Sequence, residues 1–129
     1  MMRRSLFILA GIVVAVSVSA ASLQQSPDEE RRAAITAMRA INTAENAIRQ
    51  STGKYVELAA LLDHPMMGRV KANITVTGSV VTHQGARVRL TLSADASQYQ
   101  AMVVPVATCG TAAFSDERGL IYAGKVLDC

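Results

Sequence analysis

Residues 26–51 constrain the fold most, because they predict one long amphipathic helix with a clearly marked start. Ser26 can act as the N-cap, Pro27 suits the first helical position, and Glu29 completes a capping box. Apolar residues then recur at spacings of three or four and form a single stripe: Ile35, Met38, Ile41, Ala44 and Ile48. Gly53 follows, and glycine readily adopts the left-handed conformation that ends a helix. The stripe needs a second layer to cover, and the rest of the chain is expected to supply it.

The chain after this helix predicts an antiparallel sheet. A short helical turn is expected at residues 57–63, and Gly78 and residues 83–85 are typical of turns. Alternating or turn-bounded apolar segments then predict strands at residues 70–76, 87–92, 98–104, 112–115 and 120–126. In the predicted strand at residues 87–92, Val88, Leu90 and Leu92 are expected to point inward. Residues 116–119 are expected to form the turn of a terminal hairpin. The predicted fold class is α+β, with a long N-terminal amphipathic helix packed on a four- to five-stranded antiparallel sheet.

The first twenty residues have the pattern of a secretory signal peptide. Arg3 and Arg4 precede an almost unbroken apolar run over residues 6–18, and small residues follow it. That run is shorter than the roughly 20 residues that a membrane-spanning helix needs. We therefore predict a signal peptide at residues 1–20 and a single domain at residues 21–129, exported to the periplasm or outside the cell. The alternative is an uncleaved inner-membrane anchor formed by residues 6–20.

The charge of the chain gives no support for nucleic-acid binding. The net charge is +3, but Arg3 and Arg4 belong to the predicted leader. Without them the Lys and Arg count falls from 13 to 11, against 10 acidic residues. The predicted domain is thus nearly neutral and lacks a basic stripe interleaved with aromatic residues. No nucleic-acid partner is expected, and a membrane is a partner only if the N-terminal segment is retained.

The two cysteines, Cys109 and Cys129, predict a structural disulfide. An exported chain passes through an oxidising compartment, where a pair of cysteines tends to close. The closed loop of about twenty residues would stabilise the fold by roughly 3 kcal/mol and would hold the C-terminus in place. A free nucleophilic thiol or a metal-binding pair is the alternative, but the chain has no CxxC spacing and no nearby histidine.

The other candidate residues do not form a recognisable catalytic or metal-binding pattern. His64 and His83 lie near a proline and in an expected turn, without the spacing of a metal site, so both are expected to be exposed loop residues. Asp116 and Glu117 are an acidic pair that suits a hairpin turn better than calcium, which needs six or more oxygen ligands. The sequence therefore predicts no catalytic residue, no cofactor and no metal.

Two runs of sequence resemble the globular part of bacterial type IV pilins and type II secretion pseudopilins. The first is MRAINTAENAIRQSTGKYVELAAL at residues 38–61, and the second is YQAMVVPVATCGTAAFSDERGLIYAG at residues 99–124. The resemblance extends over roughly residues 31–129 and implies a long helix packed on an antiparallel sheet. A disulfide that brackets the C-terminal region, as Cys109 and Cys129 would form, is also common in pilins.

The N-terminus departs from this family. Pilins carry a glycine followed by Phe-Thr-Leu-Ile-Glu, whereas here Arg4 is followed by Ser-Leu-Phe-Ile-Leu, and the apolar run contains no glutamate. The resemblance therefore implies the fold more than filament assembly. We expect an exported, non-enzymatic structural or interaction module whose partners are pilin-like subunits or envelope proteins. Contact is expected through the outer helix face or an exposed sheet edge such as residues 87–92. The alternatives are a small soluble ligand-binding protein that uses the helix–sheet groove and, third, an exported hydrolase.

Overall fold

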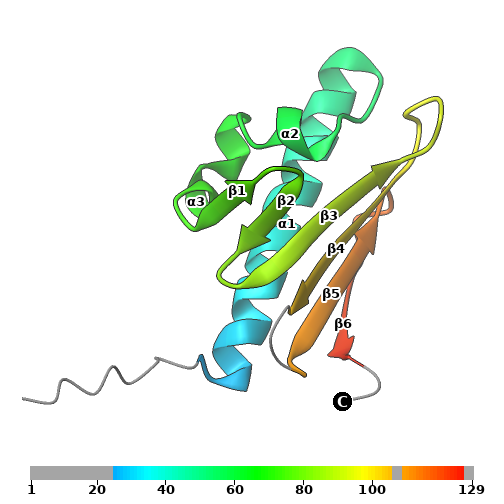
Figure 1. Ribbon diagram of the computed structural model, residues 1–129. Coiled ribbons are helices and arrows are strands. Elements are labelled where there is room, and N and C mark those ends of the chain that lie inside the picture. The colour runs from blue at the N-terminus through cyan, green and yellow to red at the C-terminus, as the bar shows by residue number, and fades with distance from the viewer. Residues whose placement is uncertain (1–24, 106–108, 127–129) are drawn as a thin grey trace, which may run out of the picture.

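One long helix lies across an antiparallel sheet in the computed structural model, which describes residues 25–105 and 109–126 (Figure 1). Helix α1 (Pro27–Thr52) is followed by three short helical segments: α2 (Leu58–Leu61), η1 (Pro65–Met67) and α3 (Gly68–Lys71). The strands then follow in the order β1 (Ile74–Thr77), β2 (Val80–His83), β3 (Ala86–Leu92), β4 (Tyr99–Pro105), β5 (Thr111–Asp116) and β6 (Ile121–Lys125). Helices and strands are segregated along the chain, which confirms the predicted α+β class.

Helix α1 begins and ends where its local chemistry predicts. The Ser26 hydroxyl accepts a hydrogen bond from the Glu29 amide at 3.3 Å, and the Glu29 carboxylate accepts one from the Ser26 amide at 3.0 Å. At the other end Gly53 adopts a φ of 80°, and its amide donates to the Arg49 carbonyl at 2.8 Å. At each end of the helix, a backbone group that lacks an ordinary intrahelical partner is thus hydrogen-bonded by a group only a few residues away.

The sheet has six strands in the order β1-β2-β3-β4-β5-β6, each antiparallel to its neighbours. The predicted count of four to five is therefore too low, and the missing strand is β2. Its residues lie between two tight turns, at Gly78–Ser79 and at Gln84–Gly85, in which Gly78, Gln84 and Gly85 have positive φ values. Because turn residues flank it on both sides, a segment of only four strand residues was too short to be recognised as a strand.

The predicted strand at residues 70–76 is wrong in its first half. Val70 lies in α3 and is buried in the core, and the strand begins only at Ile74. Alternation of apolar and polar residues over a few positions also fits one turn of helix beside a short strand. The inward face of β3 is confirmed, because Val88 is buried and Leu90 and Leu92 pack partly buried against the core.

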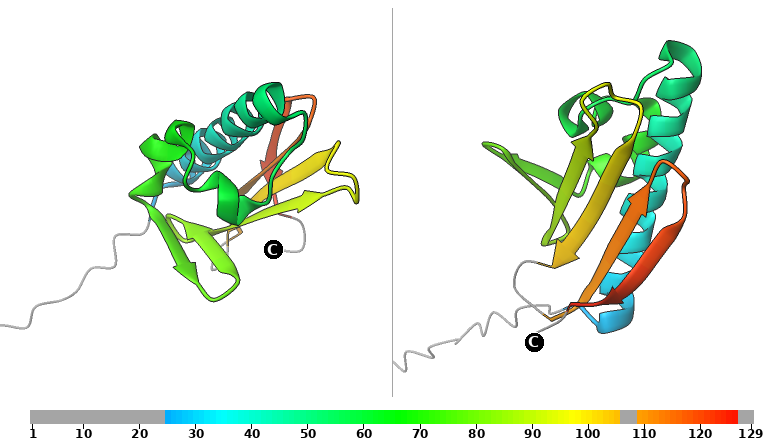
Figure 2. Two further views of the ribbon diagram at one scale, coloured as in Figure 1. Left: turned by 90° about the horizontal axis from the view of Figure 1, so that it is seen from above. Right: turned by 90° about the vertical axis from the view of Figure 1, so that its right-hand side faces the viewer.

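The centre of the core lies between α1 and the inner faces of β4 and β5, and buried residues of α2, η1, α3, β2 and β3 extend it. Met38, Ile41 and Ala44 of the predicted stripe are buried, while Ile35 and Ile48 are half-buried. Small residues on both surfaces let the helix lie close to the sheet: Ala34, Ala37 and Ala44 on α1, and Ala101 and Ala113 on the strands. The views from above and from the side show α1 running along β4, β5 and β6, while the β1–β2 hairpin lies away from it (Figure 2). The helix thus covers one half of the sheet.

The predicted N-terminal segment lies outside this description. Residues 1–20, assigned from the sequence to a signal peptide or anchor, are not among the described residues. Within residues 25–105 and 109–126, no helix has the length and apolar character needed to cross a bilayer.

Candidate functional site

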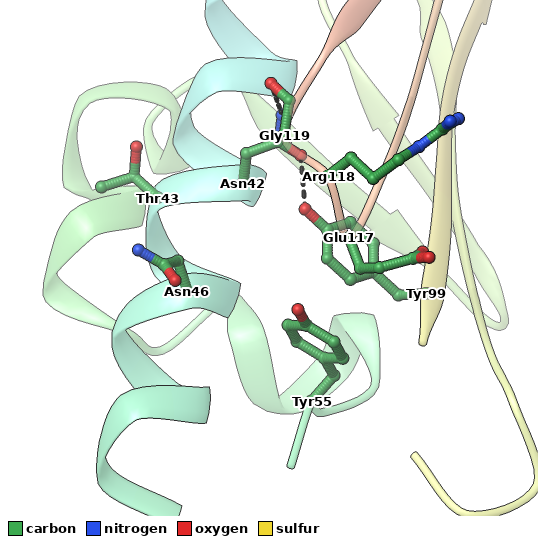
Figure 3. A pocket seen from close by; sticks show the side chains of 8 residues that line it. All are labelled: Asn42, Thr43, Asn46, Tyr55, Tyr99, Glu117, Arg118 and Gly119. Carbon is green, nitrogen blue, oxygen red and sulfur yellow. Dashed lines mark hydrogen bonds between the residues drawn. The ribbon is translucent and has the colours of Figure 1, made fainter. Parts of the chain in front are cut away.

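A polar pocket of about 330 Å³ lies where α1 meets the β5–β6 turn (Figure 3). Helix α1 lines it with Asn42, Thr43 and Asn46, and two tyrosines, Tyr55 and Tyr99, form its floor. The turn between β5 and β6 completes the pocket with Glu117, Arg118 and Gly119. The pocket lies between a helix and the sheet, which is where the alternative ligand-binding hypothesis expects a site.

Asn42 is the centre of a hydrogen-bond network in this pocket. Its side-chain oxygen accepts from the Tyr99 hydroxyl at 2.7 Å, and its amide donates to the Ser115 hydroxyl at 2.8 Å and the Gly119 carbonyl at 3.4 Å. Ser115, which is buried, donates in turn to the Leu120 carbonyl at 2.8 Å. The network joins α1, β4, β5 and the turn between β5 and β6. Its central polar atoms are therefore engaged in holding the helix to the sheet.

The two tyrosines form an aromatic pair beside this network. Their ring centroids lie 4.8 Å apart in an edge-on arrangement, and Arg49 donates to the Tyr55 hydroxyl at 2.9 Å while lying over that ring. Burial raises the pKa of Tyr99 far above its ordinary value, with smaller contributions from Tyr55 and Glu45. Tyr99 therefore stays protonated at physiological pH and acts as a hydrogen-bond donor rather than a base.

Glu45 is a fully buried carboxylate on the sheet-facing side of α1. One carboxylate oxygen accepts from the Val56 amide at 3.1 Å, and the other has no hydrogen-bond partner in the described part of the chain. Burial raises the pKa of Glu45, and the hydrogen bond from Val56 offsets part of that rise. One carboxylate oxygen thus holds the segment after α1 against the helix. The other oxygen is buried without a hydrogen bond, which is energetically unfavourable.

Substituting Glu45 by Gln should stabilise the fold at neutral pH, and the gain should shrink on acidification. Gln keeps an acceptor for Val56 but removes the buried negative charge. Because the folded-state pKa of Glu45 is raised, the native protein binds a proton before the unfolded chain does. Wild-type stability therefore recovers as pH falls through that raised value toward the ordinary one. Thermal melts of both proteins across a pH series measure the difference, with the exposed Glu57→Gln as control. A gap between wild type and Glu45→Gln that does not change with pH would contradict this assignment.

Asp116, the first residue of the acidic pair in the terminal hairpin, stabilises the turn. The Arg118 side chain donates through Nε to both oxygens of Asp116, at 3.1 and 2.9 Å, and its backbone amide donates to the same carboxylate at 3.0 Å. These hydrogen bonds from Arg118 lower the pKa of Asp116. Among the described residues no group of three or more His, Cys, Asp or Glu side chains could hold a metal ion.

The two histidines lie in different environments. His64 is half-buried in the loop before η1, where its Nδ1 accepts from the Met66 amide at 3.2 Å. The prediction that His83 lies in an exposed turn is wrong, because it is the last residue of β2 and only 2% exposed. β2 alternates in burial, and this register turns His83 inward with Val81.

The cysteine prediction rests partly on residues outside the description. Cys109 lies on the exposed segment that leads into β5. Cys129 is not among the described residues, so its disulfide with Cys109 stays a prediction.

A larger apolar groove of about 720 Å³ lies on the half of the sheet that α1 leaves uncovered. It runs between α2, the β1–β2 hairpin and the inner face of β3, and its apolar walls are Leu58, Leu62, Val76, Val88, Leu90 and Leu92. We call this surface the β3 groove. It is concave and predominantly apolar in its side chains, two properties that binding sites share.

The edge of β3 beside this groove is open over half its length. Strand β4 pairs with β3 from Ala86 to Leu92, whereas β2 pairs with it only from Ala86 to Val88. Over residues 89–92, no strand of the described chain pairs with that side of β3. The segment predicted as an exposed edge, residues 87–92, is thus internal at residues 87–88 and open at residues 89–92.

The sequence analysis did not identify the half-buried Asn42 or the buried Glu45 and His83 as polar residues of the interior. Asn42 and Glu45 each lie four residues after a core residue, Met38 and Ile41, so their helical spacing placed them on the buried side of α1. No protein-family model, curated protein or solved structure matches the chain. The arrangement of a long helix on an antiparallel sheet is compatible with the pilin-like fold that the sequence resembles.

Proposed function

We propose that this protein is an exported, non-enzymatic interaction module that binds an extended segment of a partner protein at the β3 groove. The observation that carries the proposal is the open edge of residues 89–92 directly beside an apolar groove. The partner is a pilin-like subunit or another envelope protein, in keeping with the resemblance to pilin globular domains. Binding takes place in the periplasm or outside the cell.

Strand addition explains how such a site would work. An extended segment that aligns with residues 89–92 would pair its backbone amides and carbonyls with those of β3. Its alternate side chains would then point into the groove beside Leu90 and Leu92, because side chains of a strand alternate between faces. Backbone pairing supplies affinity for any extended chain, and the apolar walls select its side chains.

The outer face of the sheet offers a less suitable surface. Cross-strand partners align Met102, Phe114 and Tyr122 in one apolar row there, and the Phe114 and Tyr122 rings lie 6.5 Å apart. Met102 and Tyr122 are exposed, but β4 and β5 are paired on both sides. The row ends at Tyr122 on β6, an edge strand of the sheet, but none of the grooves described above is lined by it, whereas the β3 groove combines a concave wall with an open edge.

Val76→Lys should weaken partner binding at least tenfold, while Val80→Lys should leave it unchanged. Both valines are exposed on the same hairpin, at 56% and 39%, but only Val76 lines the β3 groove. A lysine at position 76 would place a charge where the partner's apolar side chains are to be buried. The measurement is the amount of partner that co-purifies with the tagged protein from the producing cells. Thermal melts establish that both variants stay folded. Equal recovery with both variants would contradict the assignment of the groove.

The second candidate is a small soluble ligand-binding protein that uses the polar pocket of Figure 3. It is favoured by the pocket's volume of about 330 Å³ and by the exposed Asn46 and Thr43 on its helical wall. Such a protein would stay monomeric, and its ligand would raise the melting temperature. A subunit or interaction module would instead be recovered with envelope proteins.

A further inference from the structure

A second polar pocket, of about 460 Å³, lies where the first turns of α1 meet α3 and the β2–β3 turn. Its charged lining residues are Glu29 and Arg32 from α1 and Arg69 from α3, and its other lining residues include Asn73, His83 and Gln84. It shares no residue with the β3 groove or with the pocket of Figure 3. What it binds is therefore a separate question from the proposed partner.

His83 gives this pocket a buried polar group without a partner. The ring is only 2% exposed, and its Nδ1 has no hydrogen-bond partner in the described part of the chain. A buried polar atom left unpaired destabilises the fold, so such atoms in native proteins nearly always have partners. Burial lowers the pKa of His83, so the ring is neutral at physiological pH and has one N–H to donate.

The charges around His83 favour an anion. Arg32 and Arg69 are exposed, and neither forms an ion pair with a described residue. The only carboxylate that lines the pocket, Glu29, is engaged in the capping box through its bond from the Ser26 amide. Two guanidinium groups without an ion-pair partner among the described residues therefore line a pocket that also contains a neutral imidazole and three side-chain amides.

We propose that this pocket binds a phosphate-type oxyanion. The planar guanidinium groups of Arg32 and Arg69 match the oxygens of a phosphate, to which arginine binds in a bidentate manner. A phosphate oxygen also supplies the acceptor that an N–H at Nδ1 of His83 requires. The phosphate group could be the free ion or belong to an ester such as a lipid headgroup.

The test is a titration of the exported protein, as recovered from the producing cells, with inorganic phosphate at neutral pH and constant ionic strength. The signals of the two histidine rings are followed by NMR. Those of His83 should shift in a saturable manner, while those of His64, whose Nδ1 already accepts from the Met66 amide, should not move. A parallel titration with glycerol 3-phosphate distinguishes the two sources. Tighter binding of the ester indicates a headgroup-type ligand, and equal binding indicates free phosphate.

Neighbouring arginines on α1 provide the matched control. Arg32→Gln and Arg69→Gln should each weaken phosphate binding about tenfold, because each removes a charge-assisted hydrogen-bond donor. Arg31→Gln removes the same charge from the adjacent exposed residue, which does not line the pocket, and should have little effect. A shift of His83 that does not saturate, or equal weakening by Arg31→Gln and Arg32→Gln, would overturn the proposal. Either result would leave the β3 groove untouched.

Discussion

Ile41→Ala is expected to lower the free energy of unfolding by about 2–5 kcal/mol. Ile41 lies at the centre of the apolar stripe of α1 and is 1% exposed. Removing three carbons there leaves a cavity between the helix and the sheet. Small domains are stable by only about 5–15 kcal/mol, so this one change could remove a large part of the total.

Urea unfolding monitored by circular dichroism measures this loss. The control is Thr43→Ala, two residues along the same helix, where the side chain is exposed and bonds only to the Arg39 carbonyl. Its effect should stay within about 0.5 kcal/mol. A loss for Ile41→Ala as small as that of the control would contradict the packing of α1 against β4 and β5.

Asn42→Ala should cost about 2–3 kcal/mol, although Asn42 is polar and only half-buried. The substitution leaves the Tyr99 hydroxyl without its acceptor and removes a donor to Ser115 and Gly119. Tyr99 and Ser115 are both buried, so water does not readily replace the lost partner. The terminal hairpin would lose its main polar attachment to α1.

Asn46→Ala, one turn further along α1, is the matched control. Asn46 lines the same pocket but is exposed, and its removal should change the free energy of unfolding by no more than about 0.5 kcal/mol. A double-mutant cycle with Tyr99→Phe should show strong coupling to Asn42→Ala, because both changes remove the same hydrogen bond. Additive losses would mean that this bond does not contribute to stability.

The sequence was most informative where structure depends on neighbouring residues. The ends of α1 follow from a capping box of four consecutive residues and from a single glycine, and both ends were predicted correctly. The terminal hairpin follows from a turn that Asp116 and Gly119 build locally. The short β2 strand was missed because flanking turn residues dominate a four-residue segment.

The polar pockets and the β3 groove depend on contacts between distant parts of the chain, which the sequence does not reveal. Asn42 and Ser115 are 73 residues apart and meet only because α1 crosses the terminal hairpin. The burial of His83 depends on the register of β2, since a shift by one residue would turn the ring to the other face. The open half of β3 arises from the shortness of β2, which no local pattern in β3 predicts.

Site-specific photocrosslinking in the producing cells tests the central claim, partner binding at β3, most directly. The crosslinker replaces Thr91, on the open half of β3, or its cross-strand neighbour Gln100 on β4; both positions are exposed. We expect a discrete adduct from position 91, with its crosslinked peptide identified by mass spectrometry as one extended segment of one envelope protein. Position 100 should give none, and Val76→Lys should abolish the adduct at 91. The same adducts from both positions, or an adduct that persists in Val76→Lys, would contradict binding at the β3 groove.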